Sequence, residues 1–144
     1  MSETERRDLA NWLRPREVAL FDAMPRGDRR HGLDVARALR RTGAIDRDLI
    51  AAGLLHDCGK GKRVRLPHRV LWSLGQRYGE WIWGVAQFVP TFGYAFRQLR
   101  HHAEISARLA DEAGCSHRTV HLIRMQENPT DEDGELLRAA DEAN

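Results

Sequence analysis

RDLIAAGLLHDCGK, residues 47–60, sets an almost unbroken apolar run directly before a histidine and an aspartate. Asp46 precedes the run as a helix N-cap and Gly59 follows as a stop, so the pattern predicts a buried helix that extends to Asp57. His56 and Asp57 then lie where the pattern predicts core. A buried carboxylate needs a compensating partner, because an unpaired charge is costly inside a protein. The partner of Asp57 is therefore the first thing to identify.

Helical signals continue on both sides of this stretch. Pro15, Asp46 and Ser116 open apolar stripes of helical period, and Gly43 and Gly114 close two of them. The sequence has neither an alternating run of β-branched residues nor an Asn-Gly hairpin turn. The predicted fold class is therefore all-α, a helical bundle with short connections.

The chain length of 144 residues corresponds to a single domain. We expect its core to span residues 28–143, with residues 1–27 forming N-terminal helices that pack on it. Hydrophobic residues make up 42% and charged residues 31%, as in ordinary globular proteins. The formal net charge of +2 is too small to indicate a nucleic-acid or membrane partner, and the arginines form no stripe. We expect neither a specific nucleic acid nor a membrane as partner.

Cysteine usage and one apolar stretch bear on location and assembly. Cys58 and Cys115 form neither a CxxC pair nor a disulfide framework, and the N-terminus lacks the apolar segment of a signal peptide. The simplest interpretation is a cytoplasmic protein. The most apolar stretch, WIWGVAQFVPTFGYAF at residues 81–96, is shorter than the roughly 20 residues of a membrane span. We expect it to form core, a pocket wall or the surface of a homodimer.

Several polar side chains fall on the apolar stripes of the predicted helices, where they would point into the core. They are His31, His56, His102, Gln126 and Asp141. One histidine in such a position is usually a core residue with satisfied hydrogen bonds. Histidines and carboxylates on several helices together indicate a metal site, because helical bundles build such sites from inward side chains. A metal ion would also be the partner that Asp57 needs.

The order of these residues resembles the HD superfamily of metal-dependent phosphohydrolases over nearly all of residues 28–143. DRRHGLDVARAL is similar to that family's first-histidine helix, and AAGLLHDCGK is similar to its name-giving His-Asp motif. HHAEISARLADEAGCS resembles a later histidine helix, with His102 rather than His101 in the matching position, and LLRAADEAN resembles the closing Ala-Asp motif. The dipeptide alone is a weak signal, whereas the ordered set is specific. The resemblance implies a bundle of the HD-domain type, with residues 1–144 as one domain.

The same resemblance implies a set of metal ligands. The ligands of the first ion would be His31, His56, Asp57 and Asp141. His102 would contribute to a second ion, but Gln126 stands where members with two metals have a further histidine. A glutamine amide is a poorer ligand for transition metals than imidazole. We therefore expect about one divalent ion per chain (Mn, Fe, Co, Ni, Zn or Mg), with the second site weakened.

The implied function is hydrolysis of a nucleotide or another small phosphate ester by a metal-activated water. Asp57 and Lys60 would be catalytic, since Asp57 can orient the water or accept its proton and Lys60 can offset charge on the phosphate. Lys62 and Arg63 in the basic segment after the motif are further candidates for phosphate contact. Solvated loop charges are the alternative for all three cations.

Two other functions are compatible with the same residues. A binding or regulatory module, with a structural metal or none, would account for the glutamine at position 126. An oxygenase with a di-iron pair would need two firmly held ions, and Gln126 argues against it.

Overall fold

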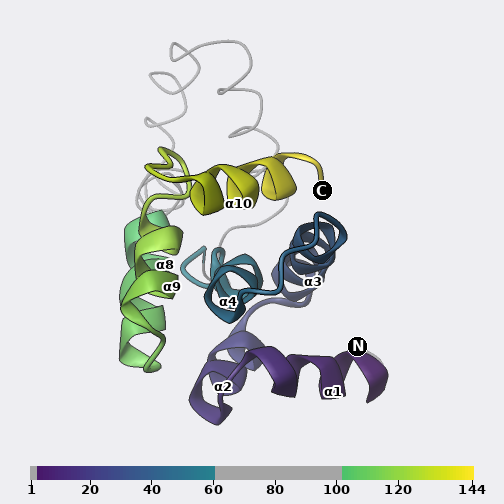
Figure 1. The fold of residues 1–144 in the computed structure, drawn as a ribbon. Helices are drawn as coiled ribbons and strands as arrows, with labels where there is room; N and C mark the ends of the chain where they lie inside the picture. Colours follow the sequence, from purple (N-terminus) through teal and green to yellow (C-terminus); the bar gives the residue numbers. More distant parts are fainter. Residues whose placement is uncertain (1–2, 61–101) are drawn as a thin grey trace, which may run out of the picture.

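A computed structural model of the chain describes residues 3–60 and 102–144. These residues form the helices α1 (Glu3–Trp12), α2 (Pro15–Ala23), α3 (Arg26–Arg41), α4 (Arg47–Leu55), α8 (His102–Glu112), α9 (His117–Arg124) and α10 (Glu132–Glu142). Figure 1 shows α4 in the middle, with α3 on one side, α8 and α9 on the other, and α10 across one end. The described part of the chain contains no strand, so the prediction of an all-α helical bundle is confirmed.

Capping side chains and glycines set several helix ends as the sequence predicts. The side chain of Asp46 accepts a hydrogen bond of 2.9 Å from the backbone N–H three residues later, at the start of α4. Ser116 caps α9 in the same way. Gly43 after α3 and Gly114 after α8 have φ angles of 92° and 86°, which glycine adopts without strain.

The helix α4 ends earlier than its apolar run predicts. It stops at Leu55, His56 caps it, and Asp57 lies in the turn beyond, so the prediction of helix through Asp57 is wrong. Beyond Leu55 the backbone hydrogen bonds join residues three apart in sequence, as in a 3₁₀ turn. The N–H of Cys58 donates to the Leu55 carbonyl, and the N–H of Lys60 donates to the Asp57 carbonyl. We call residues 56–60 the His-Asp turn.

A contact with α8 fixes the His-Asp turn. The backbone N–H of Gly59 donates to Oγ of Ser106 at 2.8 Å, so this amide is satisfied outside its own helix. A Cβ atom on Gly59 would lie 2.6 Å from the backbone nitrogen of Ser106. Glycine is therefore needed at position 59 for close approach to α8.

The core of the described bundle is built around α4. Every residue from Leu49 to Leu55 is buried, and α3, α9 and α10 all pack on this helix. The helix α3 approaches α4 closely at Gly32, where a Cβ atom would lie 2.7 Å from the carbonyl oxygen of Leu54. Because His31 precedes Gly32, this contact holds His31 beside the end of α4.

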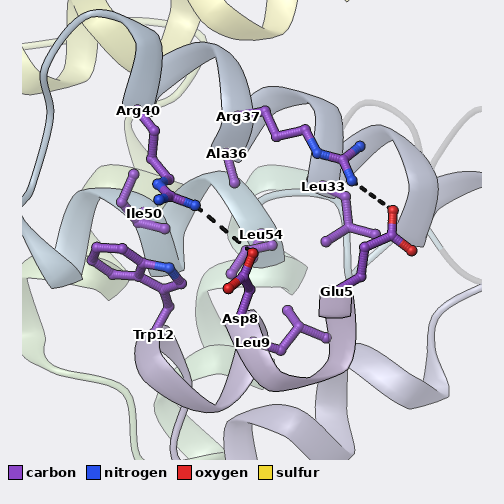
Figure 2. Close-up of a pocket in the computed structure, with 10 residues that line it drawn as sticks. All are labelled: Glu5, Asp8, Leu9, Trp12, Leu33, Ala36, Arg37, Arg40, Ile50 and Leu54. Carbon is purple, nitrogen blue, oxygen red and sulfur yellow. Dashed lines mark hydrogen bonds and ion pairs between the residues drawn. The ribbon is translucent and has the colours of Figure 1, made fainter. Parts of the chain in front are cut away.

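The helix α1 packs on α3 and α4 through both apolar and charged side chains. Figure 2 shows the hollow that they share, with Trp12 on one wall. The guanidinium carbon of Arg40 lies 5.6 Å from the centroid of the Trp12 ring, and Arg37 pairs with Glu5 at 2.5 Å. Charges of α1 and α3 therefore compensate one another around this hollow.

Some of the predictions concern residues that lie outside the described ranges. Lys62, Arg63 and the apolar stretch 81–96, with its homodimer surface, are among them. Within residues 3–60 and 102–144, no helix combines the length and apolar character needed to cross a membrane.

Candidate metal centre

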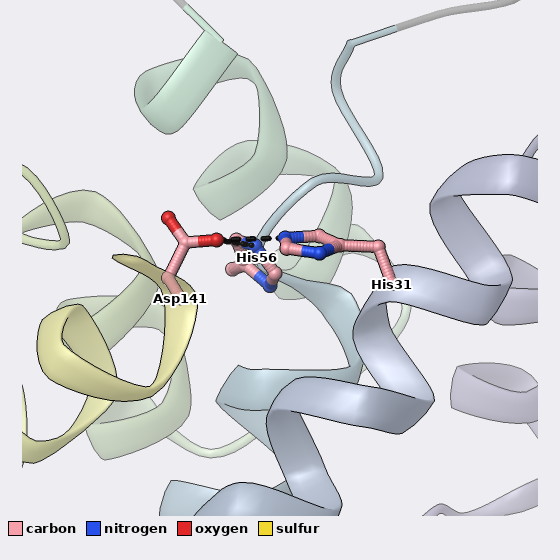
Figure 3. A group of neighbouring side chains, drawn as sticks. All are labelled: His31, His56 and Asp141. Atoms are coloured by element: carbon pink, nitrogen blue, oxygen red, sulfur yellow. Dashed lines mark hydrogen bonds and ion pairs between the residues drawn. The ribbon is translucent and has the colours of Figure 1, made fainter. Parts of the chain in front are cut away.

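Three side chains from different parts of the chain meet beside the His-Asp turn. His31 comes from α3, His56 caps α4, and Asp141 lies in the last turn of α10. The Nε2 atoms of His31 and His56 lie 2.7 Å and 3.2 Å from the same oxygen, Oδ1 of Asp141. Figure 3 shows the two rings and the carboxylate directed at one another. We call these three residues the candidate metal centre, since one ligand atom from each lies within 4.8 Å of the others.

The orientation of the His56 ring suits a metal ligand. Its Nδ1 donates a hydrogen bond of 2.9 Å to the carbonyl oxygen of Gly53. A carbonyl can only accept, so the proton of the neutral ring is on Nδ1 and a lone pair is left on Nε2. This Nε2 is buried and has no hydrogen-bond partner among the described residues. A histidine held through one nitrogen with the other free is the usual arrangement of a metal ligand.

The separations in the candidate metal centre also match those between ligands of one ion. Bonds of about 2.0–2.2 Å to nitrogen and oxygen place neighbouring ligand atoms roughly 3–3.5 Å apart. The observed 2.7 Å and 3.2 Å are close to this range. Two imidazoles and one carboxylate are a common ligand set for divalent transition metals. The residues present therefore fit a divalent ion.

The carboxylate of Asp57 lies at the edge of this centre and is fully buried. Its Oδ2 accepts a hydrogen bond of 2.5 Å from Nζ of Lys60, the partner that the structure gives to this buried charge. Its Oδ1 has no hydrogen-bond partner among the described residues and lies 3.5 Å from Nε2 of His56. When the His56 ring is neutral, two buried atoms with unused lone pairs therefore lie 3.5 Å apart, Oδ1 of Asp57 and Nε2 of His56.

The charges around the centre stabilise one another. Burial opposes ionisation of Asp57, but His56 and Lys60 outweigh it and hold the pKa of this carboxyl below its usual range. Burial also opposes ionisation of Asp141, and the neighbouring His31 and His56 lower its pKa. Burial opposes protonation of His56, but Asp57 and Asp141 raise its pKa, so a metal ion would bind Nε2 in place of a proton. Both carboxylates are therefore ionised at neutral pH and available to a cation.

His102 and Gln126 lie near the His-Asp turn but outside the group of three. Nε2 of His102 is 4.0 Å from Oδ1 of Asp57, and its Nδ1 is 3.7 Å from Oε1 of Glu127. The amide nitrogen of Gln126 donates to the backbone carbonyl of His56 at 3.2 Å, in buried surroundings. Gln126 is thus engaged by the backbone at the position where the resemblance implies a second-metal histidine.

The structure brings most of the predicted site residues close to one another, but not all of them into the same group of ligand atoms. His31, His56 and Asp141 converge, and Asp57 lies beside them. His102 lies 4.0 Å from Oδ1 of Asp57, the oxygen that His56 also faces. Lys60, expected to face substrate, is bound to Asp57.

Two contributors were not predicted from the sequence. The Gly53 carbonyl orients His56 from three residues before it, a spacing at which side chains commonly bond their own helix. Ser106 holds the His-Asp turn and lies four residues after His102, on the same helix face. These two spacings were the signals that could have identified them.

Comparisons with protein-family models, with curated proteins and with solved structures found no match to this chain. The resemblance to the HD superfamily therefore depends on the motif residues alone. The geometry of the candidate metal centre is therefore the basis for proposing a function.

Proposed function

We propose that the chain is a metal-dependent phosphohydrolase of the HD type, acting on a nucleotide or another small phosphate ester. The observation that carries the proposal is the buried Nε2 of His56, which has no hydrogen-bond partner among the described residues and lies 3.2 Å from the Asp141 oxygen that His31 also contacts. A buried polar atom without a hydrogen-bond partner destabilises a fold unless a bound ligand interacts with that atom. A divalent cation is the ligand that this set of donors would bind.

Each residue near the centre has a role in the proposed reaction. A divalent ion held by His31, His56 and Asp141 would supply a Lewis acid and a water of lowered pKa. Asp57, whose Oδ1 lies 3.5 Å from Nε2 of His56, orients the attacking water and accepts the proton that the water loses. Lys60 offsets negative charge on the phosphate, and Lys62 and Arg63 add to the positive charge that attracts the substrate.

Metal binding is the first test. The metal-stripped protein should take up about one equivalent of Mn²⁺, Fe²⁺, Co²⁺, Ni²⁺ or Zn²⁺, measured by elemental analysis after gel filtration. His56→Gln should lose this ion, while His117→Gln, at an exposed position of α9, should keep it. Circular dichroism of both variants checks that the helices persist. Failure of the wild type to bind any of these metals would overturn the proposal.

Turnover is the second test, on a panel of nucleotides and generic phosphate esters with each metal. The loaded wild type should release phosphate from at least one of them. Asp57→Asn should reduce that rate by about a hundredfold or more, since it removes the proposed proton acceptor.

A binding or regulatory module is the second candidate function, and the contact of Gln126 favours it. The Gln126 amide is already bonded to the His56 carbonyl, which supports the expectation that a second metal is weak or absent. A chain that binds one ion but hydrolyses no ester on the panel, with any of the metals, would belong to this class.

The setting we propose is the cytoplasm, where the thiols of Cys58 and Cys115 stay reduced; both are free cysteines. A homodimer formed through residues 81–96 is part of the same proposal. Light scattering at a protein concentration of about 100 µM would identify it, because a homodimer with a Kd of about 100 µM or lower is substantially populated at that concentration.

A further inference from the structure

The ammonium of Lys60 occupies a place that a metal ion would compete for. It lies 2.5 Å from Oδ2 of Asp57, and the Lys60 side chain is only 17% exposed. The other oxygen of the same carboxylate has no hydrogen-bond partner among the described residues and faces His56. One carboxylate thus has a cation on one oxygen and an unsatisfied position on the other.

These two positions cannot easily be filled together. An ion bound to Oδ1 of Asp57 and Nε2 of His56 would share one carboxylate with the Lys60 ammonium, leaving the positive charges a few ångströms apart. Asp57 is fully buried, and repulsion is strong where little water screens it. Nε2 of His31 lies 3.9 Å and Nε2 of His102 lies 4.0 Å from Asp57, and neither ring adds negative charge. The negative charge nearest to the ion's other side is Asp141, with Oδ1 3.2 Å from Nε2 of His56, and the ion itself would occupy that carboxylate.

The backbone allows Lys60 to leave without rearranging the site. The Lys60 N–H is bonded to the Asp57 carbonyl, and the Gly59 N–H is bonded to Oγ of Ser106 on α8. The N–H groups of the turn therefore hold it through hydrogen bonds that do not involve the Lys60 side chain, and this four-carbon side chain can rotate away from Asp57 by itself.

We propose that Lys60 is a built-in competitor of the metal ion for Asp57, which the incoming ion displaces and which then binds the phosphate of the substrate. The inference rests on the proposed function and gives that site an order of binding: metal first, phosphate second. Without metal, Lys60 neutralises the buried carboxylate. With metal bound, the released ammonium becomes available to an anion.

Metal affinity tests the first half. Mn²⁺ titrations followed by calorimetry should give a Kd at least tenfold tighter for Lys60→Gln than for the wild type, because the competing charge is gone. Lys60→Arg keeps the charge and should stay near the wild type. Arg7→Gln removes the same charge from α1, in an exposed ion pair with Glu3, and should also change nothing. An unchanged or weaker Mn²⁺ affinity in Lys60→Gln would overturn the proposal.

The stability of the variant gives an independent readout. Without metal, Lys60→Gln leaves the buried carboxylate of Asp57 without its ammonium partner, so the melting temperature of the variant should fall below that of the wild type. Mn²⁺ should then raise it by more than it raises the wild type. If Lys60→Gln is unfolded without metal, refolding on addition of Mn²⁺ supports the competition and failure to refold refutes it.

Inorganic phosphate tests the second half. The wild type saturated with Mn²⁺ should bind phosphate at least tenfold more tightly than the metal-free wild type or Mn²⁺-loaded Lys60→Gln. Equal phosphate affinities in the two Mn²⁺-loaded proteins would overturn the release of Lys60. Mn²⁺ binding by neither protein would refute the proposed function itself, whereas Mn²⁺ binding with equal affinity would refute only the competition.

Discussion

At the scale of one residue, Gln126 joins two parts of the molecule that are distant in sequence. Gln126 lies in the turn after α9, and its side-chain amide donates to the carbonyl of His56, the first residue of the His-Asp turn. The bond is buried, so the carbonyl has no access to water as a substitute donor. Gln126 is thus a support for the turn that carries His56 and Asp57.

Replacing Gln126 should therefore destabilise the protein. Gln126→Leu should lower the free energy of unfolding by about 1–3 kcal/mol, because a buried carbonyl loses its donor. Asn128→Leu, at an exposed position two residues later, is the matched control and should have little effect. Urea denaturation followed by circular dichroism measures both. Equal losses in the two variants would mean that the amide contributes nothing specific.

At the scale of elements, the contact between α3 and α4 determines where His31 lies. The two helices touch at Gly32, where the space beside the Leu54 carbonyl is too small for a methyl group. Tight packing of this kind transmits a small displacement directly to neighbouring residues. A change at Gly32 should therefore move His31 relative to His56, although Gly32 is not one of the three residues of the candidate metal centre.

The Gly32 variant should reverse the usual effect of glycine replacement in a helix. Alanine in place of glycine normally stabilises a helix interior by about 1 kcal/mol. Gly32→Ala should instead destabilise the protein by about 1–3 kcal/mol, since its Cβ would lie 2.7 Å from the Leu54 oxygen. It should also weaken Mn²⁺ binding in calorimetry. Gly27→Ala, at an exposed position of the same helix, should be neutral or stabilising; a similar result at Gly32 would disprove the tight contact.

At the scale of the whole molecule, the candidate metal centre connects α3, α4 and α10. An ion that binds only when these helices are in place stabilises all of them together. At a hundredfold excess over its Kd, Mn²⁺ should add about 2.7 kcal/mol to the free energy of unfolding. Differential scanning calorimetry should show the rise in melting temperature. Asp141→Asn should remove most of it and Asp111→Asn, an exposed carboxylate on α8, should not.

Local signals in the sequence were enough to predict much of the bundle. Asp46, Ser116, Gly43 and Gly114 act through hydrogen bonds and backbone angles within their own turns, so the sequence alone identifies these helix ends. The early end of α4 was not predictable in this way. It involves Ser106, which lies 47 residues from its partner Gly59.

The same distinction holds for the candidate site. Helical spacing predicted that His31, His56 and Asp141 point inward, and the structure brings them together. Spacing does not say which atom a side chain finally contacts. Lys60 could reach solvent, substrate or Asp57, and the choice depends on how deeply Asp57 is buried. Gln126 could likewise face a metal or a carbonyl, and the packing of α9 on α4 decides it.

The contact between His31 and Asp141 has a consequence for the order of events in folding. These residues are 110 positions apart, and their side chains are 2.7 Å apart in the folded chain. An ion bound by both residues would cross-link two distant parts of the chain and close a very long loop. Such long-range contacts form late in folding, because closing the loop costs entropy. An interaction that forms after the folding barrier slows unfolding without accelerating folding. The metal would thus govern the lifetime of the folded chain, and a chelator would shorten that lifetime while leaving the rate of folding unchanged.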